Sequence, residues 1–232
     1  MLDWLAAGHG FWYEALPYTA MALLLVGFLH RRMHHPETLA LVSTRQLESR
    51  LHFWTSVPLH YGVGFVLAVH LLAFLFPSLL VWWNRSALRR SSLEFLLLTA
   101  AVTALIGVTV GVRRRRSDPR VHAVTRRGDW AVLLVLAWQV VSGFLIATLH
   151  PWGSGWLAAA GAPYVRSLFV LNPDSQAIAA APLLMRLHIV NAWILVILIP
   201  FTRLVHAILI PVGYLWRPYL VYRRRRRHAY TD

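Results

Sequence analysis

The sequence contains no cysteine and no lysine, and it has few charged residues of any kind. Without cysteine, the chain cannot form disulfides, ligate an iron–sulfur cluster or attach a c-type haem covalently. Charged residues make up only 14% of the chain and hydrophobic residues 58%, so a soluble domain of this length would lack the polar surface that it needs. The composition therefore predicts a membrane protein.

Five apolar runs are long enough to cross a bilayer core of about 30 Å as helices, at a rise of about 1.5 Å per residue. The predicted spans are residues 13–31, 53–77, 93–112, 130–149 and 183–210. No basic residue precedes the first run, so we expect a retained helix and not a cleaved signal peptide. The predicted fold class is all-α, a polytopic membrane helix bundle with five transmembrane helices in a single domain, residues 1–232.

The basic residues are all arginine, and they are distributed unevenly among the loops. Eighteen of the 23 lie in the loops after the first and third spans and at the C-terminal end, and five lie on the opposite side. The positive-inside rule then places the N-terminus outside and the C-terminus in the cytoplasm of a multi-pass protein of the cell (inner) membrane. Topology and contact with the lipid bilayer account for the net charge of +14, so we expect no nucleic-acid partner.

Four of the 12 histidines fall inside predicted spans, His60 and His70 in the second and His188 and His206 in the fifth. An ionisable side chain at membrane depth needs a partner. The two spans run in opposite directions, so His60 and His206 lie nearer the cytoplasm and His70 and His188 nearer the outside. Two histidine pairs at two depths are what two six-coordinate haems b require, with one axial nitrogen from each helix. A set of interhelical hydrogen bonds is the alternative.

The spacing within the two spans is unequal. On the fifth span, 18 residues separate the histidines, which would place both on one helix face about 27 Å apart. On the second span, 10 residues separate them, or about 15 Å, and the two rings would differ by about 80° around the axis. The helices must therefore tilt, or the haem planes must be inclined. Gly62 and Gly64 would leave room for a porphyrin, although close helix packing explains them equally well.

Two axial histidines leave no open position on an iron, so the expected chemistry is electron transfer and not catalysis at the iron. The natural electron donor to such a pair of haems in a membrane is quinol.

Several segments resemble the gamma subunit, the cytochrome b subunit, of respiratory nitrate reductase. They are Arg186–His188, Pro200–His206 with Pro211, Tyr214 and Leu215, His60–Gly62 through His70 to Pro77, Ser117–Val121 with Thr125 and Asp129, and Ser43 with Gln46–Glu48. The resemblance implies the same ligands: His60 and His206 for the cytoplasmic-side haem, and His70 and His188 for the outer haem. It also implies quinol oxidation outside, and electron transfer to an iron–sulfur beta subunit and a molybdenum-cofactor alpha subunit on the cytoplasmic face, which reduces nitrate.

The resemblance also suggests candidates for the quinol site and for the haem propionates. His70, Arg90 and Glu94 are the quinol-site candidates. The family often has a lysine where Arg90 stands, and arginine can donate a hydrogen bond to a quinone oxygen but cannot accept a proton. Arg203, on the turn before His206, is a candidate propionate partner.

Two alternatives remain open at this point. The same dihaem anchor can serve another molybdenum oxidoreductase or a nitrite-oxidising complex, because the terminal substrate binds elsewhere. A haem-free anchor or transporter could instead use the four histidines as a proton relay. Transporters more often contain internal repeats, and the sequence shows none.

Overall fold

The computed structural model describes residues 8–34 and 50–208, and the regular structure in these ranges is helical throughout. Four described helices are long and apolar enough to cross a membrane. They are the π-helical turn η1 (Phe11–Ala15) continuing into α2 (Leu16–His34), α3 (Arg50–Leu75), α5 (Ala87–Ser117) and α7 (Arg127–Leu149). Large apolar side chains remain exposed on them, including Phe95 at 66% and Leu134 at 73%, as expected for surfaces that face lipid. The predicted all-α membrane fold is confirmed.

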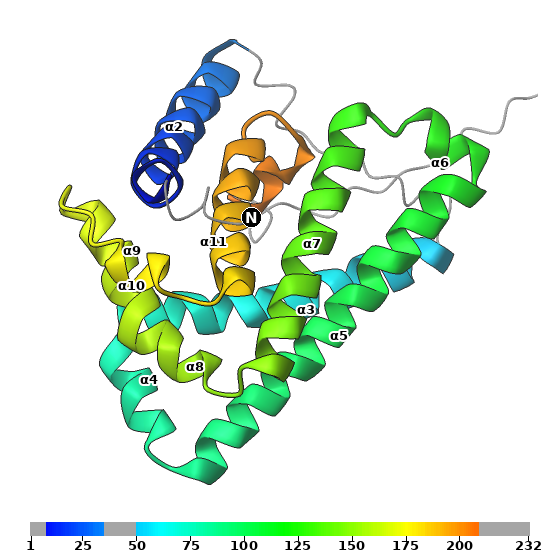
Figure 1. Ribbon diagram of the computed structural model, residues 1–232. Coiled ribbons are helices and arrows are strands. Elements are labelled where there is room, and N and C mark those ends of the chain that lie inside the picture. Colours follow the sequence, from blue (N-terminus) through cyan, green and yellow to red (C-terminus); the bar gives the residue numbers. More distant parts are fainter. Residues whose placement is uncertain (1–7, 35–49, 209–232) are drawn as a thin grey trace, which may run out of the picture.

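The fifth predicted span is not one continuous helix. Helix α11 (Leu183–Leu198) has 16 residues and ends near Pro200, which has no N–H to donate and whose ring clashes with the preceding turn. The chain then turns back beside α11, and the 3-10 helix η5 (Arg203–Ala207) carries His206 (Figure 1). The prediction that His188 and His206 share one face of one helix was therefore wrong. Residues 209 and 210 of the predicted span lie outside the described residues.

The third helix is longer than the hydropathy predicts. α5 begins at Ala87 and ends at Ser117, so the run Arg113–Arg116 belongs to its last turns and not to a loop. Cations near a helix C-terminus are stabilised by the helix dipole, which explains why the helix continues past its apolar part. The short helix α6 (Pro119–Ala123) follows, with the Asp118 carboxylate accepting hydrogen bonds from the backbone N–H groups of Arg120 and Val121.

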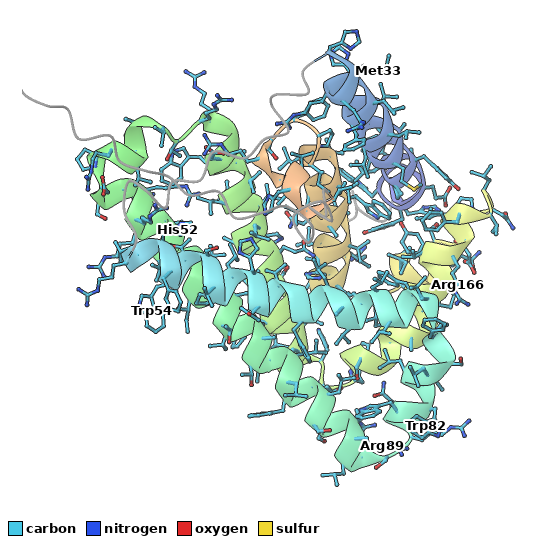
Figure 2. The ribbon with its side chains drawn as sticks, turned by 180° about the vertical axis from the view of Figure 1, so that it is seen from behind. Met33, His52, Trp54, Trp82, Arg89 and Arg166 are labelled. Atoms are coloured by element: carbon cyan, nitrogen blue, oxygen red, sulfur yellow. The ribbon has the colours of Figure 1, made fainter. Side chains whose placement is uncertain are left out.

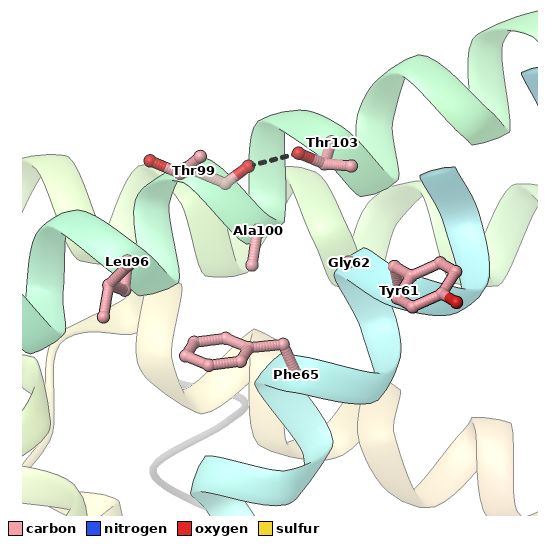
Figure 3. A pocket seen from close by; sticks show the side chains of 7 residues that line it. All are labelled: Tyr61, Gly62, Phe65, Leu96, Thr99, Ala100 and Thr103. Atoms are coloured by element: carbon pink, nitrogen blue, oxygen red, sulfur yellow. Dashed lines mark hydrogen bonds between the residues drawn. The ribbon is translucent and has the colours of Figure 1, made fainter. Parts of the chain in front are cut away.

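Helices α3 and α5 pack against each other more extensively than any other pair in the described part of the chain. A Cβ atom added to Gly62 would lie 2.5 Å from the carbonyl oxygen of Ala100, and one added to Gly107 would lie 2.6 Å from the backbone nitrogen of Leu59. Both glycines are therefore needed for the close approach of the two backbones. Beside Gly62 an apolar groove opens between the helices (Figure 3), lined by Tyr61, Gly62, Phe65, Leu96, Thr99, Ala100 and Thr103.

The C-terminal end of α3 and the N-terminal end of α5 diverge, and α4 (Pro77–Asn84) joins them (Figure 1). Arg89 at the start of α5 lies over the ring of Trp82, with its guanidinium carbon 4.4 Å from the ring centre (Figure 2). This cation–π contact and hydrogen bonds from Arg89 to the carbonyls of Trp82 and Trp83 hold the α4–α5 turn.

The segment between α7 and α11, which lies between two predicted spans, is largely helical. It contains α8 (Gly153–Trp156), the π-helical turn η4 (Leu157–Gly161), α9 (Ala162–Phe169) and α10 (Gln176–Ala179). Tyr164 donates a hydrogen bond to the carbonyl of Tyr13 at 2.7 Å, and Arg166 donates to the last carbonyls of α3, at Phe74 and Leu75 (Figure 2). The segment therefore joins the start of the first helix to the end of α3.

Candidate haem-binding histidines

His60 of α3 and His206 of η5 face each other, with ring centroids 5.7 Å apart and ring planes at 52°. The Nδ1 atom of His60 lies 2.7 Å from the carbonyl oxygen of Ser56, and the Nδ1 atom of His206 lies 2.7 Å from the carbonyl oxygen of Arg203. A carbonyl oxygen only accepts, so each Nδ1 carries the proton and each Nε2 keeps its lone pair. Both rings therefore have the tautomer of an Nε2 metal ligand.

The separation of these two rings fits one metal ion held between them. Two metal–nitrogen bonds of about 2 Å on opposite sides of an ion would put the ring centroids about 6 Å apart. Gly64 lies one turn beyond His60 on the same side of α3, and a Cβ atom added there would meet nothing within 4 Å. The two imidazoles thus have the separation of two ligands to one metal ion, and α3 leaves open space beside them at Gly64.

His70 lies further along α3 and is held in the same way. Its Nδ1 donates to the carbonyl oxygen of Val66 at 2.8 Å, and its ring meets Phe74 edge-on. Within the described residues, the Nε2 atoms of His60, His70 and His206 have no hydrogen-bond partner, because each ring's recorded bonds use Nδ1. Three of the four predicted ligands therefore present the same nitrogen.

His188 of α11 differs, because both of its ring nitrogens are hydrogen-bonded to side chains of α7. Its Nε2 lies 3.0 Å from the amide nitrogen of Gln139, and its Nδ1 lies 2.8 Å from the hydroxyl of Ser142. The rings of His70 and His188 are not in contact in the described part of the chain. The structure thus brings His60 and His206 together directly and does not bring His70 and His188 into contact.

Arg203 has partners other than a propionate. Its Nε atom lies 3.5 Å from a carboxylate oxygen of Asp129, and it also donates to the carbonyl of Val124 at 3.1 Å. The other carboxylate oxygen of Asp129 accepts from the backbone N–H of Arg126, which caps α7. Arg203 therefore fastens η5, and with it His206, to the start of α7.

The three quinol-site candidates, His70, Arg90 and Glu94, do not contact one another. Arg90 is exposed at the start of α5, and within the described residues its side chain has no recorded partner. One turn later, Glu94 accepts a hydrogen bond from Ser154 of α8 at 2.9 Å. His70 shares no recorded contact with either of them. Glu94 and Ser154 thus join α5 to the outer segment.

The structure adds polar residues that the sequence reasoning missed. Gln139, Ser142 and Asn191 surround His188. A signal was present in the sequence, since Gln139 and Ser142 stand three residues apart in an otherwise apolar span, and Asn191 follows His188 by three. Residues at this spacing lie on one face of a helix.

Comparison with known proteins gives the family. The family model of the nitrate reductase gamma subunit matches residues 9–225. The chain belongs to the nitrate reductase gamma subunit family. The match to this gamma subunit family includes all four membrane histidines.

Three relatives illustrate the gamma subunit family. The nitrate reductase gamma chain of Bacillus subtilis (strain 168) is 28% identical over 90% of this chain and 96% of its own length. The respiratory nitrate reductase 1 gamma chain of Escherichia coli (strain K12) is 28% identical over 93% and 97%. The nitrate reductase-like protein NarX of Mycobacterium tuberculosis (strain ATCC 25618 / H37Rv) is 32% identical over 97% of this chain, which spans only 35% of that longer relative.

Proposed function

We propose that this chain is the membrane cytochrome b subunit of a nitrate reductase complex. It oxidises quinol on the outer side and passes the electrons through two haems b to iron–sulfur and molybdenum subunits on the cytoplasmic side. The observation that carries the proposal is the inner histidine pair, two facing rings 5.7 Å apart with their Nδ1 atoms tied to carbonyls. The names of the relatives support nitrate reductase as the complex.

At each haem, the side chains of this protein would bind the haem and exclude other ligands from its iron. His60 and His206 would hold one haem, and His70 and His188 the other, and a bound haem supplies reversible one-electron transfer. Two imidazole ligands to one iron would leave no open position for oxygen or substrate. The bonds from Nδ1–H to carbonyl oxygens, 2.7 Å at both His60 and His206, fix the ring orientation and raise the basicity of Nε2.

On the outer side, Arg90 and Glu94 offer complementary chemistry. The exposed Arg90 guanidinium can donate to a quinone oxygen, and the Glu94 carboxylate can accept a proton and is held by Ser154 at 2.9 Å. On the cytoplasmic side, the last turns of α5 expose Arg113 and Arg116, whereas Arg114 is buried. A cationic surface of this kind suits docking of an acidic partner subunit.

The test is to count haems in histidine variants of the complex. A reduced-minus-oxidised spectrum of the wild type should give two haems b per chain. His60→Ala and His206→Ala should each leave one haem, the same one, because the two side chains serve one iron. His122→Ala is the matched control, since His122 lies in α6 and, among the described residues, its ring bonds only to the carbonyl of Arg115.

Two haems retained in either His60→Ala or His206→Ala would contradict the ligand assignment. A wild type without haem would contradict the function itself.

A further inference from the structure

The turn after α11 packs against the first helix. Helix α2 lies beside α11 (Figure 1), and a Cβ atom added to Gly27 would lie 2.8 Å from Cβ and 3.0 Å from Cγ of Pro200. One turn further along α2, the guanidinium of Arg31 donates to the carbonyl oxygens of Pro200 at 3.1 Å and of Thr202 at 2.8 Å. Residues four apart share one face of a helix, so Gly27 and Arg31 contact the same turn.

The hydrogen bonds from Arg31 stabilise the chain at the point where the hydrogen bonds of α11 end. The last carbonyl groups of a helix have no N–H partner within it, and the helix dipole favours a cation beside them. Arg31 supplies both a donor and a positive charge at this point. The hydroxyl of Thr202 adds a second support, because it donates to the carbonyl of Leu198 at 2.7 Å.

The same turn determines where η5 begins. Thr202 is the N-cap of η5, and its hydroxyl accepts a hydrogen bond from the backbone N–H of Leu204 at 3.2 Å. His206 lies four residues after Thr202, on this short helix. Its ring faces His60, with the ring centroids 5.7 Å apart. A shift of Pro200 or Thr202 would therefore move His206 relative to His60.

We propose that Gly27 and Arg31 of the first helix are positioning residues for His206. Gly27 lets α2 come close to Pro200, and Arg31 holds the turn by two of its carbonyls. The ion pair described above fastens η5 to the start of α7, so α2 and α7 both hold the part of the chain that carries His206. The consequence for a bound haem rests on the function proposed above, whereas the placement of His206 does not.

Loss of the Arg31 hydrogen bonds should change the distance and the angle between the two imidazole rings. The ring planes stand at 52° in this structure. In an oxidised iron with two axial imidazoles, the highest g value of the EPR spectrum depends on that angle, and the midpoint potential depends on the axial bonds. Arg31→Ala should therefore shift both for the haem that is lost in His206→Ala. Arg31→Lys keeps the charge and a donor, and should shift them less.

The experiment combines low-temperature EPR with a redox titration of the assembled complex in membranes. Arg32→Ala is the matched control for Arg31→Ala, because Arg32 is the exposed neighbour and the same charge is removed. Gly27→Ala should shift the same signals, since its Cβ atom would displace the ring of Pro200. Gly155→Ala is the control for Gly27→Ala, because a Cβ atom there meets nothing within 4 Å.

A cross-linking measurement tests the placement of His206 without a haem. The chain has no cysteine, so His60→Cys together with His206→Cys provides one defined pair of thiols, which a short bifunctional thiol reagent should join. Addition of Arg31→Ala should lower the yield of this cross-link several-fold, and addition of Arg32→Ala should leave it unchanged. The absence of a cross-link in the parent pair would contradict the facing of the two rings on which the inference depends.

The outcomes separate this inference from the proposed function. Unchanged EPR, potential and cross-linking in both Arg31→Ala and Gly27→Ala would overturn the inference while the dihaem function stands. Equal changes in Arg31→Ala and Arg32→Ala would also overturn it, since they would come from the charge alone. A wild type without haem would contradict the proposed function, and the cross-link would then decide the placement of His206 by itself.

Discussion

At the scale of single residues, the membrane histidines are held by two different means. His60, His70 and His206 each bond through Nδ1 to a carbonyl three or four residues earlier. His188 is bonded instead to side chains of a neighbouring helix. An unpartnered polar group at membrane depth is costly. The first arrangement satisfies one ring nitrogen, whereas at His188 both ring nitrogens are satisfied. A bond to a backbone carbonyl requires no particular residue near the histidine, so the sequence gives no sign of it. The bonds of His188 require polar side chains on α7, which the sequence does show.

Arg90 and its neighbour Arg89 provide a direct test of the quinol site. Arg90 is exposed, whereas Arg89 is held on Trp82 at the α4–α5 turn. Arg90→Ala should lower kcat/KM for quinol about tenfold, the loss expected for a hydrogen bond from a charged donor, and should leave both haem spectra intact. Steady-state quinol oxidation by the complex measures this.

Arg89→Ala is the comparison variant for that experiment. It should destabilise the turn and lower the temperature of unfolding, which Arg90→Ala should not do. An unchanged quinol dependence in Arg90→Ala would remove Arg90 from the site.

At the scale of helices, the contact between α3 and α5 depends on backbone proximity. Gly62 and Gly107 lie where the helices touch, so the close-packing explanation holds for Gly62. Gly64 faces open space, so close packing does not explain that position. Sequence alone could not separate the two roles, because both glycines belong to the same apolar run and only the crossing point of the helices distinguishes them.

The variant Gly62→Ala tests this contact. Its Cβ would meet backbone atoms of Ala100 and Ala104 at 2.5 and 2.7 Å, and backbone atoms cannot move aside without separating the helices. We expect destabilisation by about 1–3 kcal/mol, as for overpacking in a core. Thermal unfolding of the purified protein at a fixed scan rate measures it.

Gly155→Ala is the control for the helix contact, since a Cβ atom at Gly155 meets nothing within 4 Å. If Gly62→Ala unfolded at the same temperature as Gly155→Ala, the result would contradict the inference that Gly62 is needed for the close contact between α3 and α5.

The helices themselves were largely predictable, because long apolar runs leave few alternatives in a membrane. α3 and α7 begin and end within about three residues of the predicted limits. The end of α11 was missed although Pro200 signals it, since hydropathy alone carries the run past the proline. The short helices between α7 and α11 were not predicted. They are held by distant partners, such as Ser175 donating to Glu14 at 2.6 Å, and no local sequence pattern encodes those contacts.

At the scale of the whole molecule, the arginine distribution predicts which side each end faces. The cysteine-free sequence makes this testable with single cysteines. Val170 is 73% exposed in the outer segment, and Val124 is 42% exposed after α6. A membrane-impermeant maleimide should label Val170→Cys in intact cells and should label Val124→Cys only after lysis, because positively charged loops stay in the cytoplasm.

The cysteine-free parent chain is the control for this labelling. Labelling of Val124→Cys, but not Val170→Cys, in intact cells would reverse the predicted orientation.

The turn after α11 has a consequence for the movement of an electron along the chain. A straight helix would have separated His188 and His206 by about 27 Å along its axis, whereas the ligands on α3 would be only about 15 Å apart. Because the chain folds back before η5 (Figure 1), that long spacing is no longer imposed. Tunnelling falls off steeply with distance, so in the proposed dihaem arrangement the break at Pro200 would shorten the gap that an electron crosses between the two haems.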